Sequence, residues 1–293
     1  MVVSQPGQNN DNETFQLLLQ YIEKELKFNC HDYNEAYIRR RLNARMLTNN
    51  LPQDNFVTYL KALKTTPDEP KKLYDALTIN VTQFFRDTRA WEILENDVFP
   101  KVIAEKKNQP NRTLSIWSCG CSSGEEPYSL AIMMKELIKG REVVPKIIAT
   151  DIDDLSLKKA HAGVYSAAAF KTTPPEYLDR YFHRSKDAKG IEKFEIDASV
   201  KSVVQIYCLN AITQMPPGTN FDMIFCRNVI IYFTQETKTK LMQKFYDALK
   251  DNGWLVIGKS EVLFTAKTEN KFYVYNGAES IYRKDRRSLE DRQ

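Results

Sequence analysis

Small residues and two adjacent glutamates follow a short apolar run near the middle of the chain. The run, LSIWSC, leads into SCGCSSGEEPYSLA at residues 118–131. Gly120 and Gly124 let the backbone approach a ligand closely, and a helix is predicted to begin at Glu125. Glu125 and Glu126 would repel a pyrophosphate, which binds to the amides of a helix N-terminus. A positively charged ligand without phosphates fits better, and S-adenosylmethionine, with its sulfonium and ammonium groups, has this character.

Polar residues also follow two other apolar runs. Asp151 ends KIIATD, and Arg227 and Asn228 follow FDMIFC. An acid at such a strand end is suited to ribose hydroxyls. The alternative is that the acid caps the next helix, and Asp153 is the better candidate for that cap. For the pair after FDMIFC, the alternative to a ligand contact is a solvated loop.

A third polar group precedes the first of these runs, in TINVTQFFRD at residues 78–87. Asn80, Thr82 and Arg86 alternate there with apolar residues. The segment is compatible with ligand contacts, and equally with a hinge between domains.

Strands that alternate with helices must position these residues. Strands are predicted at 114–119, 146–151, 203–208, 221–226 and 253–258, and helices at about 125–138, 154–161 and 235–249. This alternation is typical of a mostly parallel sheet covered on both faces, an α/β fold that binds ligands at the carboxyl ends of its strands. The runs FYVYN and ESIYR, joined by a turn at Gly277, predict an antiparallel hairpin at the sheet edge.

Residues of about 164–200 do not fit this alternation and are predicted to form a small inserted β-subdomain. EKFEID within it has β character. Insertions of this kind carry partner contacts or are passive elaborations, and both interpretations stay open.

The N-terminal part is predicted to be helical. Phe15, Leu18 and Ile22 recur at helical spacing, and Ile38, Leu42 and Met46 do so in a second helix. The expected organisation is a disordered start at 1–12, a small all-α domain at 13–77, a linker with a helix at 78–110, the α/β domain at 111–285 and a tail at 286–293.

The second helix is basic. Arg39, Arg40, Arg41 and Arg45 lie on it, away from its apolar stripe. One interpretation is a solvated face with ion pairs inside the domain. The other is a surface that docks an acidic helical substrate.

Composition excludes several classes of protein. The chain has 293 residues, 42% of them hydrophobic, and a net charge of +4, which is too small to demand nucleic acid. No apolar run approaches the roughly 20 residues of a membrane helix, and the N-terminus does not resemble a secretory signal, so a cytoplasmic protein without membrane insertion is expected. The five scattered cysteines predict reduced thiols rather than a metal site. We expect a monomer.

The motifs taken together resemble the chemotaxis receptor methyltransferases of the CheR type. The resemblance rests on TINVTQFFRD, WSCGCSSGEEPYSLA, ATDID, FCRNVIIYF and GKSE, which follow one another in family order and spacing over residues of about 13–285. It implies a class I S-adenosylmethionine-dependent methyltransferase domain behind a small all-α domain. The implied reaction forms methyl esters of glutamate side chains on the cytoplasmic helices of methyl-accepting chemoreceptors, with S-adenosylhomocysteine as product.

The resemblance also implies roles for individual residues. It assigns cofactor contacts to Asn80, Thr82, Arg86, Glu126, Asp151, Asn210, Ala211, Arg227 and Asn228. Arg86 and Tyr232 match residues near the methyl-transfer site, and Arg40, Arg41 and Arg45 match the receptor-docking arginines. The sequence departs from the family pattern at Val81, where many members have glutamate, and at Cys119-Gly120, where alanines are commoner.

The chemistry agrees with the absence of histidine from these motifs. A glutamate carboxylate, with a pKa of about 4.3, is already ionised at neutral pH and needs no general base. Two alternatives stay open. One is a non-catalytic module that binds the cofactor or the receptor. The other is a methyltransferase for another protein or for nucleic acid, although FCRN stands where amino-methylating DNA enzymes carry (D/N)-P-P-(Y/F).

Overall fold

The chain divides into two compact units. The computed structural model describes residues 6–78, 81–138, 140, 142–261 and 272–284, with side chains from residue 12 onward. The helical unit comprises Met1–Ile79 and Tyr232–Lys238, and the α/β unit comprises Asn80–Ile231 and Thr239–Gln293. Each unit is described separately.

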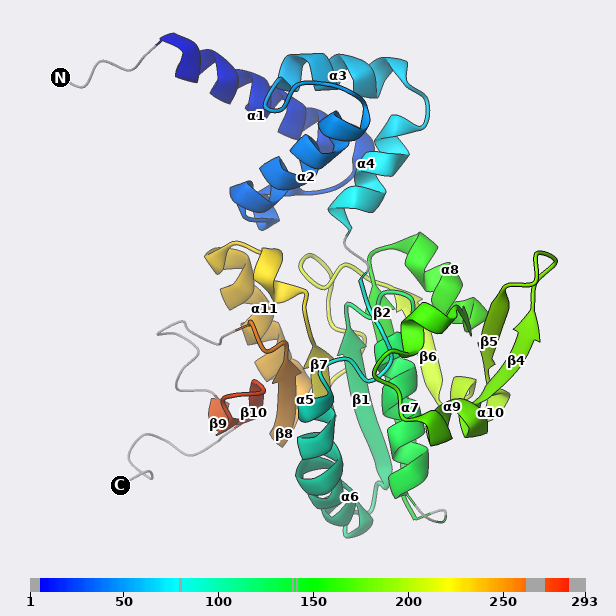
Figure 1. Ribbon diagram of the computed structural model, residues 1–293. Helices are drawn as coiled ribbons and strands as arrows, with labels where there is room; N and C mark the ends of the chain where they lie inside the picture. The colour runs from blue at the N-terminus through cyan, green and yellow to red at the C-terminus, as the bar shows by residue number, and fades with distance from the viewer. Residues whose placement is uncertain (1–5, 79–80, 139, 141, 262–271, 285–293) are drawn as a thin grey trace, which may run out of the picture. The chain divides into compact units, whose positions relative to one another are not determined.

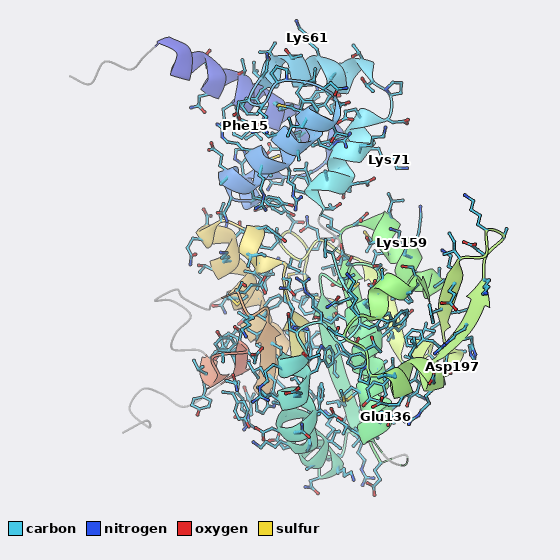
Figure 2. All side chains as sticks on the ribbon, viewed as in Figure 1. Phe15, Lys61, Lys71, Glu136, Lys159 and Asp197 are labelled. Atoms are coloured by element: carbon cyan, nitrogen blue, oxygen red, sulfur yellow. The ribbon has the colours of Figure 1, made fainter. Side chains whose placement is uncertain are left out.

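Amphipathic helices build the helical unit. They are α1 (Pro6–Leu26), α2 (Glu35–Thr48), α3 (Phe56–Thr65) and α4 (Glu69–Leu77), with a 3-10 turn at Cys30–Asp32. The predicted apolar stripes are confirmed, because Phe15, Leu18 and Ile22 are fully buried and pack with Ile38 and Leu42. Figure 2 shows Phe15 among these helices.

Helix α1 begins earlier than the sequence suggested. It starts at Pro6, so the expected disorder of residues 1–12 is wrong for residues 6–12. Asn and Gly are poor helix formers in this stretch, but Pro6 is compatible with the first position of a helix.

A second correction concerns the segment Tyr232–Lys238, which we expected inside the α/β domain. Phe233 forms an antiparallel bridge with Tyr33, and the backbone N–H of Thr234 donates to the carbonyl of Asp32 at 2.9 Å. The hydroxyl of Thr237 donates to the carboxylate of Asp32 at 3.2 Å. These contacts make the segment part of the helical unit.

The α/β unit contains the predicted mostly parallel sheet. Its order is β6-β2-β1-β7-β8-β10-β9, and the first five of these strands run parallel. The bounds are β1 (Thr113–Cys119), β2 (Val144–Asp151), β6 (Val204–Cys208), β7 (Phe221–Cys226), β8 (Leu249–Ile257), β9 (Phe272–Asn276) and β10 (Ile281–Lys284). Strands β9 and β10 form the predicted antiparallel hairpin at the edge. Figure 1 shows the strands with the helices around them.

Helices cover both faces of this sheet because successive strand side chains point to opposite faces. Ile116 of β1 packs in the large core with α5 (Thr88–Ile93), the π-helical turn Leu94–Val98, α6 (Phe99–Lys107) and α7 (Glu125–Leu137). Its neighbour Trp117 contacts Phe245 of α11 (Gln235–Ala248), with ring centroids 5.4 Å apart. Helix α8 (Asp154–Ala162) contributes Leu157, which packs with Ala149 of β2.

The predicted inserted β-subdomain is present as a separate three-stranded antiparallel sheet, in the order β3-β5-β4 (Figure 1). Its elements are β3 (Val164–Tyr165), a 3-10 turn at Ala167–Phe170, α9 (Pro175–Tyr181), β4 (Phe182–Lys186), β5 (Glu192–Ile196) and α10 (Ala198–Lys201). Phe84, from the predicted linker, stacks on Phe170 of this subdomain with ring centroids 5.0 Å apart. The amide of Phe84 donates to the carbonyl of Ala169 at 2.9 Å. The linker is therefore packed into the α/β unit.

A buried charge cluster lies on β7, within the run FDMIFC. Asp222 is fully buried, and its carboxylate lies 3.0 Å from the ammonium nitrogen of Lys106 and 2.5 Å from that of Lys250. The same carboxylate accepts the backbone N–H of Ser115 at 2.8 Å. Two cations thus share one buried anion.

Candidate cofactor site

The glycine-rich loop after β1 is tightly packed against its neighbours. Gly120 has a φ of +78°, and a Cβ there would lie 2.4 Å from Cγ2 of Val229. The amides of Gly120 and Cys121 both donate to the carbonyl of Thr150, at 2.7 and 3.0 Å. Gly124, with a φ of +95°, precedes α7. Glycine is therefore required at residue 120 by both conformation and space.

Glu126 lies in the first turn of α7, next to the ends of β1 and β7. Its carboxylate accepts the hydroxyl of Ser118 at 2.8 Å and lies 3.7 Å from a guanidinium nitrogen of Arg227. Burial raises the pKa of Glu126, and Arg227 opposes that rise. The pair places one cation beside a carboxylate that is costly to ionise.

Asp151 joins two loops at the end of β2. One carboxylate oxygen accepts the amide of Ser122 at 2.7 Å, and the other accepts the amide of Asp153 at 2.9 Å. Burial raises the pKa of Asp151. The predicted cap of α8 is confirmed, because Asp153 accepts the amide of Leu155 at 3.0 Å. Each oxygen of Asp151 keeps a lone pair, so a ribose hydroxyl can still donate to it.

Asn210 and Ala211 lie in the turn after β6. The side-chain oxygen of Asn210 accepts the amide of Ile212 at 2.9 Å. Lys244 of α11 fixes the same turn, since its ammonium group donates to the carbonyls of Ala211 and Gln214 at 3.1 and 2.8 Å. We did not predict this role of Lys244, because a lysine that binds backbone carbonyls cannot be distinguished in the sequence from a lysine exposed to solvent.

Arg227 is a buried connector, so the solvated-loop alternative is wrong for it. Its side chain is 4% exposed, and the guanidinium donates to the carbonyl of Arg86 at 2.9 Å and to the carboxylate of Asp87 at 2.8 Å. Asn228 follows in the left-handed region with a φ of +62°, and its amide donates to Glu261 at 2.9 Å. Sequence reasoning gave no role to Asp87 or Glu261.

The linker brings further predicted residues to this edge. The guanidinium of Arg86 donates to the carbonyl of Val81 at 2.9 Å, and the carbonyl of Arg86 accepts the indole N–H of Trp91. The amide of Phe85 donates to the hydroxyl of Ser129 on α7 at 3.0 Å. Thr82 is half-buried, and Asn80 lies outside the described residues.

The structure thus brings together most of the predicted site. Adjacent parallel strands end in register, with Cys119 opposite Thr150 and Asp151 opposite Cys208. The predicted residues at the resulting edge are Arg86, Glu126, Asp151, Asn210, Ala211, Arg227 and Asn228.

The other predicted residues belong to the helical unit. The ring of Tyr232 packs on that of Tyr37 with centroids 4.7 Å apart. Arg45 forms a bidentate ion pair with Glu69, at 2.5 and 3.0 Å, and Glu69 is 1% exposed. Of the two interpretations of the basic helix, the ion pair inside the domain is therefore the one that Arg45 supports. Arg40 is exposed, and Arg41 is half-buried with its guanidinium 5.5 Å from the ring of Tyr37.

The described residues contain no group of three or more His, Cys, Asp or Glu side chains able to hold a metal ion. Among the helices in the described ranges, none is both long and apolar enough to cross a membrane.

The charges of the site fit S-adenosylmethionine. Glu126 and Asp151 are half-buried carboxylates whose pKa values burial raises, and Arg86 and Arg227 are cations near Glu126. A positively charged ligand lowers the cost of ionising such carboxylates, whereas a pyrophosphate increases it.

Family models match almost the whole chain. The model described as the S-adenosylmethionine-binding domain of CheR methyltransferases matches residues 80–280, and the model of the all-alpha domain of the same family matches residues 13–78. The first of these ranges includes the segment 80–110, which we predicted as a separate linker.

Curated relatives agree with the family models. A chemotaxis protein methyltransferase of Borreliella burgdorferi is 32% identical over 251 residues, which cover 84% of this chain and 87% of the relative. Chemotaxis protein methyltransferase 1 of Pseudomonas aeruginosa is 33% identical over 258 residues, which cover 86% of this chain and 91% of the relative. The chain is an S-adenosylmethionine-dependent methyltransferase and belongs to the CheR methyltransferase family.

Proposed function

We propose that this protein methylates glutamate side chains on the cytoplasmic helices of chemoreceptors and acts in the cytoplasm. The products are glutamate methyl esters and S-adenosylhomocysteine. The observation that carries the proposal is the acid-rich edge of the sheet. There Glu126 and Asp151 bind Ser118 and Ser122, which flank a position, residue 120, that has room only for glycine. The chemotaxis relatives support chemoreceptors as the substrate class.

The proposed cofactor residues come from five segments of the α/β unit. Asp151 binds the ribose hydroxyls, and the turn at Asn210 and Ala211 lies on the adenine side. The remaining proposed contacts are Asn80, Thr82 and Arg86 of the linker, Glu126 after the glycine loop, and Arg227 and Asn228 after β7. The buried positions of Glu126 and Arg227 support an electrostatic role for this pair.

The reaction makes modest chemical demands on the protein. S-adenosylmethionine supplies an electrophilic methyl group on a cationic sulfur. The acceptor carboxylate is ionised before it binds, so the protein orients it and excludes water. His161 is in the last turn of α8 and His183 pairs with Asp197 on the inserted subdomain, so neither takes part in this edge, and His31 belongs to the helical unit. We assign orientation of the acceptor or the cofactor to Arg86 and Tyr232.

The test is transfer of a tritiated methyl group to a chemoreceptor cytoplasmic fragment, followed by mild alkali. Alkali-labile counts released as methanol are expected, because an ester hydrolyses under these conditions and a methylated amine does not. Asp151→Ala should lower the rate at subsaturating cofactor by about 100-fold, as it loses a buried acceptor of hydrogen bonds. Asp154→Ala removes an exposed carboxylate three residues away and serves as the control.

Three outcomes contradict the proposal. Alkali-stable counts would identify a nitrogen or carbon acceptor, and counts on nucleic acid alone would identify another substrate class. Measured cofactor binding without any transfer to the receptor fragment would leave a non-catalytic module as the better description.

Receptor docking is proposed for Arg40 and Arg41, whereas Arg45 has a structural partner. Arg40→Ala should raise KM for the receptor fragment about fivefold and leave the melting temperature unchanged, because its guanidinium is exposed. Arg45→Ala should instead destabilise the helical unit by about 3 kcal/mol, because it leaves Glu69 buried without its cation. Receptor titrations and thermal unfolding separate the two effects.

The control for docking is Lys61→Ala, which removes an exposed cation from α3 (Figure 2). Equal KM values for the Lys61 and Arg40 variants would mean that net charge, rather than the face of α2, attracts the substrate.

A further inference from the structure

Glu261 is a buried acid just after the end of β8, within the motif GKSE, and the reaction described above gives it no task. It is 3% exposed. Its partners among the described residues are backbone amides rather than a lysine or arginine. One oxygen accepts the amides of Gly258 at 2.5 Å and Asn228 at 2.9 Å, and the other accepts the amide of Ile231 at 3.1 Å. Removing a carboxylate from water is costly, so this buried side chain depends on the hydrogen bonds from these amides.

What Glu261 fixes is the turn after β7. Its two oxygens bind the two ends of residues 228–231, so the side chain acts as a brace across the turn. The turn contains a strained residue, since Asn228 is in the left-handed region with a φ of +62°. Side-chain bonds of this kind stabilise a backbone conformation that the local sequence does not favour.

Space for this brace depends on Gly258. A Cβ at residue 258 would lie 2.7 Å from the Glu261 carboxylate and 2.8 Å from the amide nitrogen of Asn228. Both distances are too short for a carbon atom in contact with nitrogen or oxygen. Glycine at this position therefore allows the carboxylate and the turn to approach each other.

The braced turn forms one side of the cofactor site. Arg227 immediately precedes it and donates to Asp87 and to the carbonyl of Arg86. Val229 within it packs so closely on Gly120 that no side chain fits there. A shift of the turn would therefore move the guanidinium of Arg227, the amide of Asn228 and the side chain of Val229 that packs on Gly120.

We propose that Glu261 is a positioning residue for methyl transfer, which holds the turn 228–231 in the conformation that presents Arg227 and Asn228 to S-adenosylmethionine. This inference rests on the assignment of those two residues to the cofactor in the proposed function. It gives the GKSE motif a physical role: Gly258 provides the space and Glu261 the acceptor.

Glu261→Gln is the direct test, because it preserves size but replaces one acceptor oxygen with an NH2 donor. KM for S-adenosylmethionine should rise about tenfold, while kcat at saturating cofactor should stay within about threefold of the wild-type value. A general loss of folded protein would lower the apparent kcat instead. In the NMR spectrum, the amide proton of Gly258 should resonate downfield in the wild type, because its nitrogen lies 2.5 Å from the carboxylate oxygen of Glu261. This downfield shift should be lost in Glu261→Gln.

The matched control is Glu279→Gln. Glu279 is also buried, at 5% exposure, but it pairs with Lys259 at 3.3 Å. Its variant should leave KM unchanged. Gly258→Ala is the second variant, because its methyl group displaces the carboxylate without removing the charge, and the same rise in KM is expected.

Three results would contradict either the role of Glu261 or the cofactor assignment on which it rests. An unchanged KM in Glu261→Gln, alongside weaker cofactor binding by Arg227→Ala, would contradict the role of Glu261. If Arg227→Ala and Asn228→Ala both bind S-adenosylhomocysteine like the wild type, the cofactor assignment itself is wrong. If Glu261→Gln does not fold, Gly258→Ala with an unchanged KM contradicts the role of Glu261.

Discussion

Replacing Arg227 with alanine should raise the dissociation constant for S-adenosylhomocysteine by about 100-fold, which corresponds to about 3 kcal/mol. The side chain is 4% exposed. Its guanidinium donates to the carbonyl of Arg86 and the carboxylate of Asp87, and it lies 3.7 Å from the carboxylate of Glu126. Its loss removes the cation paired with Asp87 and one of the two cations near Glu126, and it frees the linker from the end of β7. Isothermal titration with the product measures the effect.

A lysine at this position keeps the charge but lacks the planar fork, so Arg227→Lys should recover only part of the affinity. The control is Arg180→Ala in the inserted subdomain. Arg180 is 54% exposed and pairs with Glu136, which Figure 2 labels near the end of α7. Equal dissociation constants for Arg180→Ala and Arg227→Ala would show that the buried guanidinium contributes nothing specific to the cofactor.

Asp222→Asn should be the most destabilising single change in the α/β unit, at about 3–5 kcal/mol. The fully buried carboxylate balances Lys106 and Lys250, and an asparagine leaves two ammonium groups next to an uncharged amide. Urea unfolding followed by circular dichroism gives the free energy, and the transition midpoint should fall without a change in slope.

Asp247→Asn is the matched comparison for this experiment. Asp247 is exposed on α11 and accepts only the side-chain amide of Gln243 in the contacts described, at 2.8 Å. Its variant should change the free energy of unfolding by less than about 0.5 kcal/mol. If the two variants unfold at the same urea concentration, the cluster around Asp222 does not stabilise the unit.

The sequence predicted the sheet well because its strands are short apolar runs separated by helices. The run VVQIYC was assigned to the main sheet and EKFEID to the insertion, and both assignments are confirmed by β6 and β5. The ligand edge followed from the same pattern, since parallel strands end at one edge whatever their order. Local periodicity was therefore sufficient for these features.

Long-range polar partners could not be predicted in this way. The ion pair of Arg45 and Glu69 joins residues 24 positions apart, and the bond from Asn228 to Glu261 joins residues 33 positions apart. The roles of Lys244 and Asp222 could not be predicted, because the sequence does not show whether a single charged residue in a helix or strand is solvated or buried. Their roles depend on tertiary packing, which no local pattern encodes.

The helical unit is built from two separate stretches of chain, and this limits how the protein can be recombined. Exchanging only the first 79 residues with those of a relative would introduce foreign residues at positions 32–34 while retaining the native Tyr232–Lys238 that pairs with them. A viable chimaera must carry both stretches from the same parent. We therefore expect substitutions at Asp32 and Thr237 to be inherited together across the family, although 205 positions separate them in the sequence.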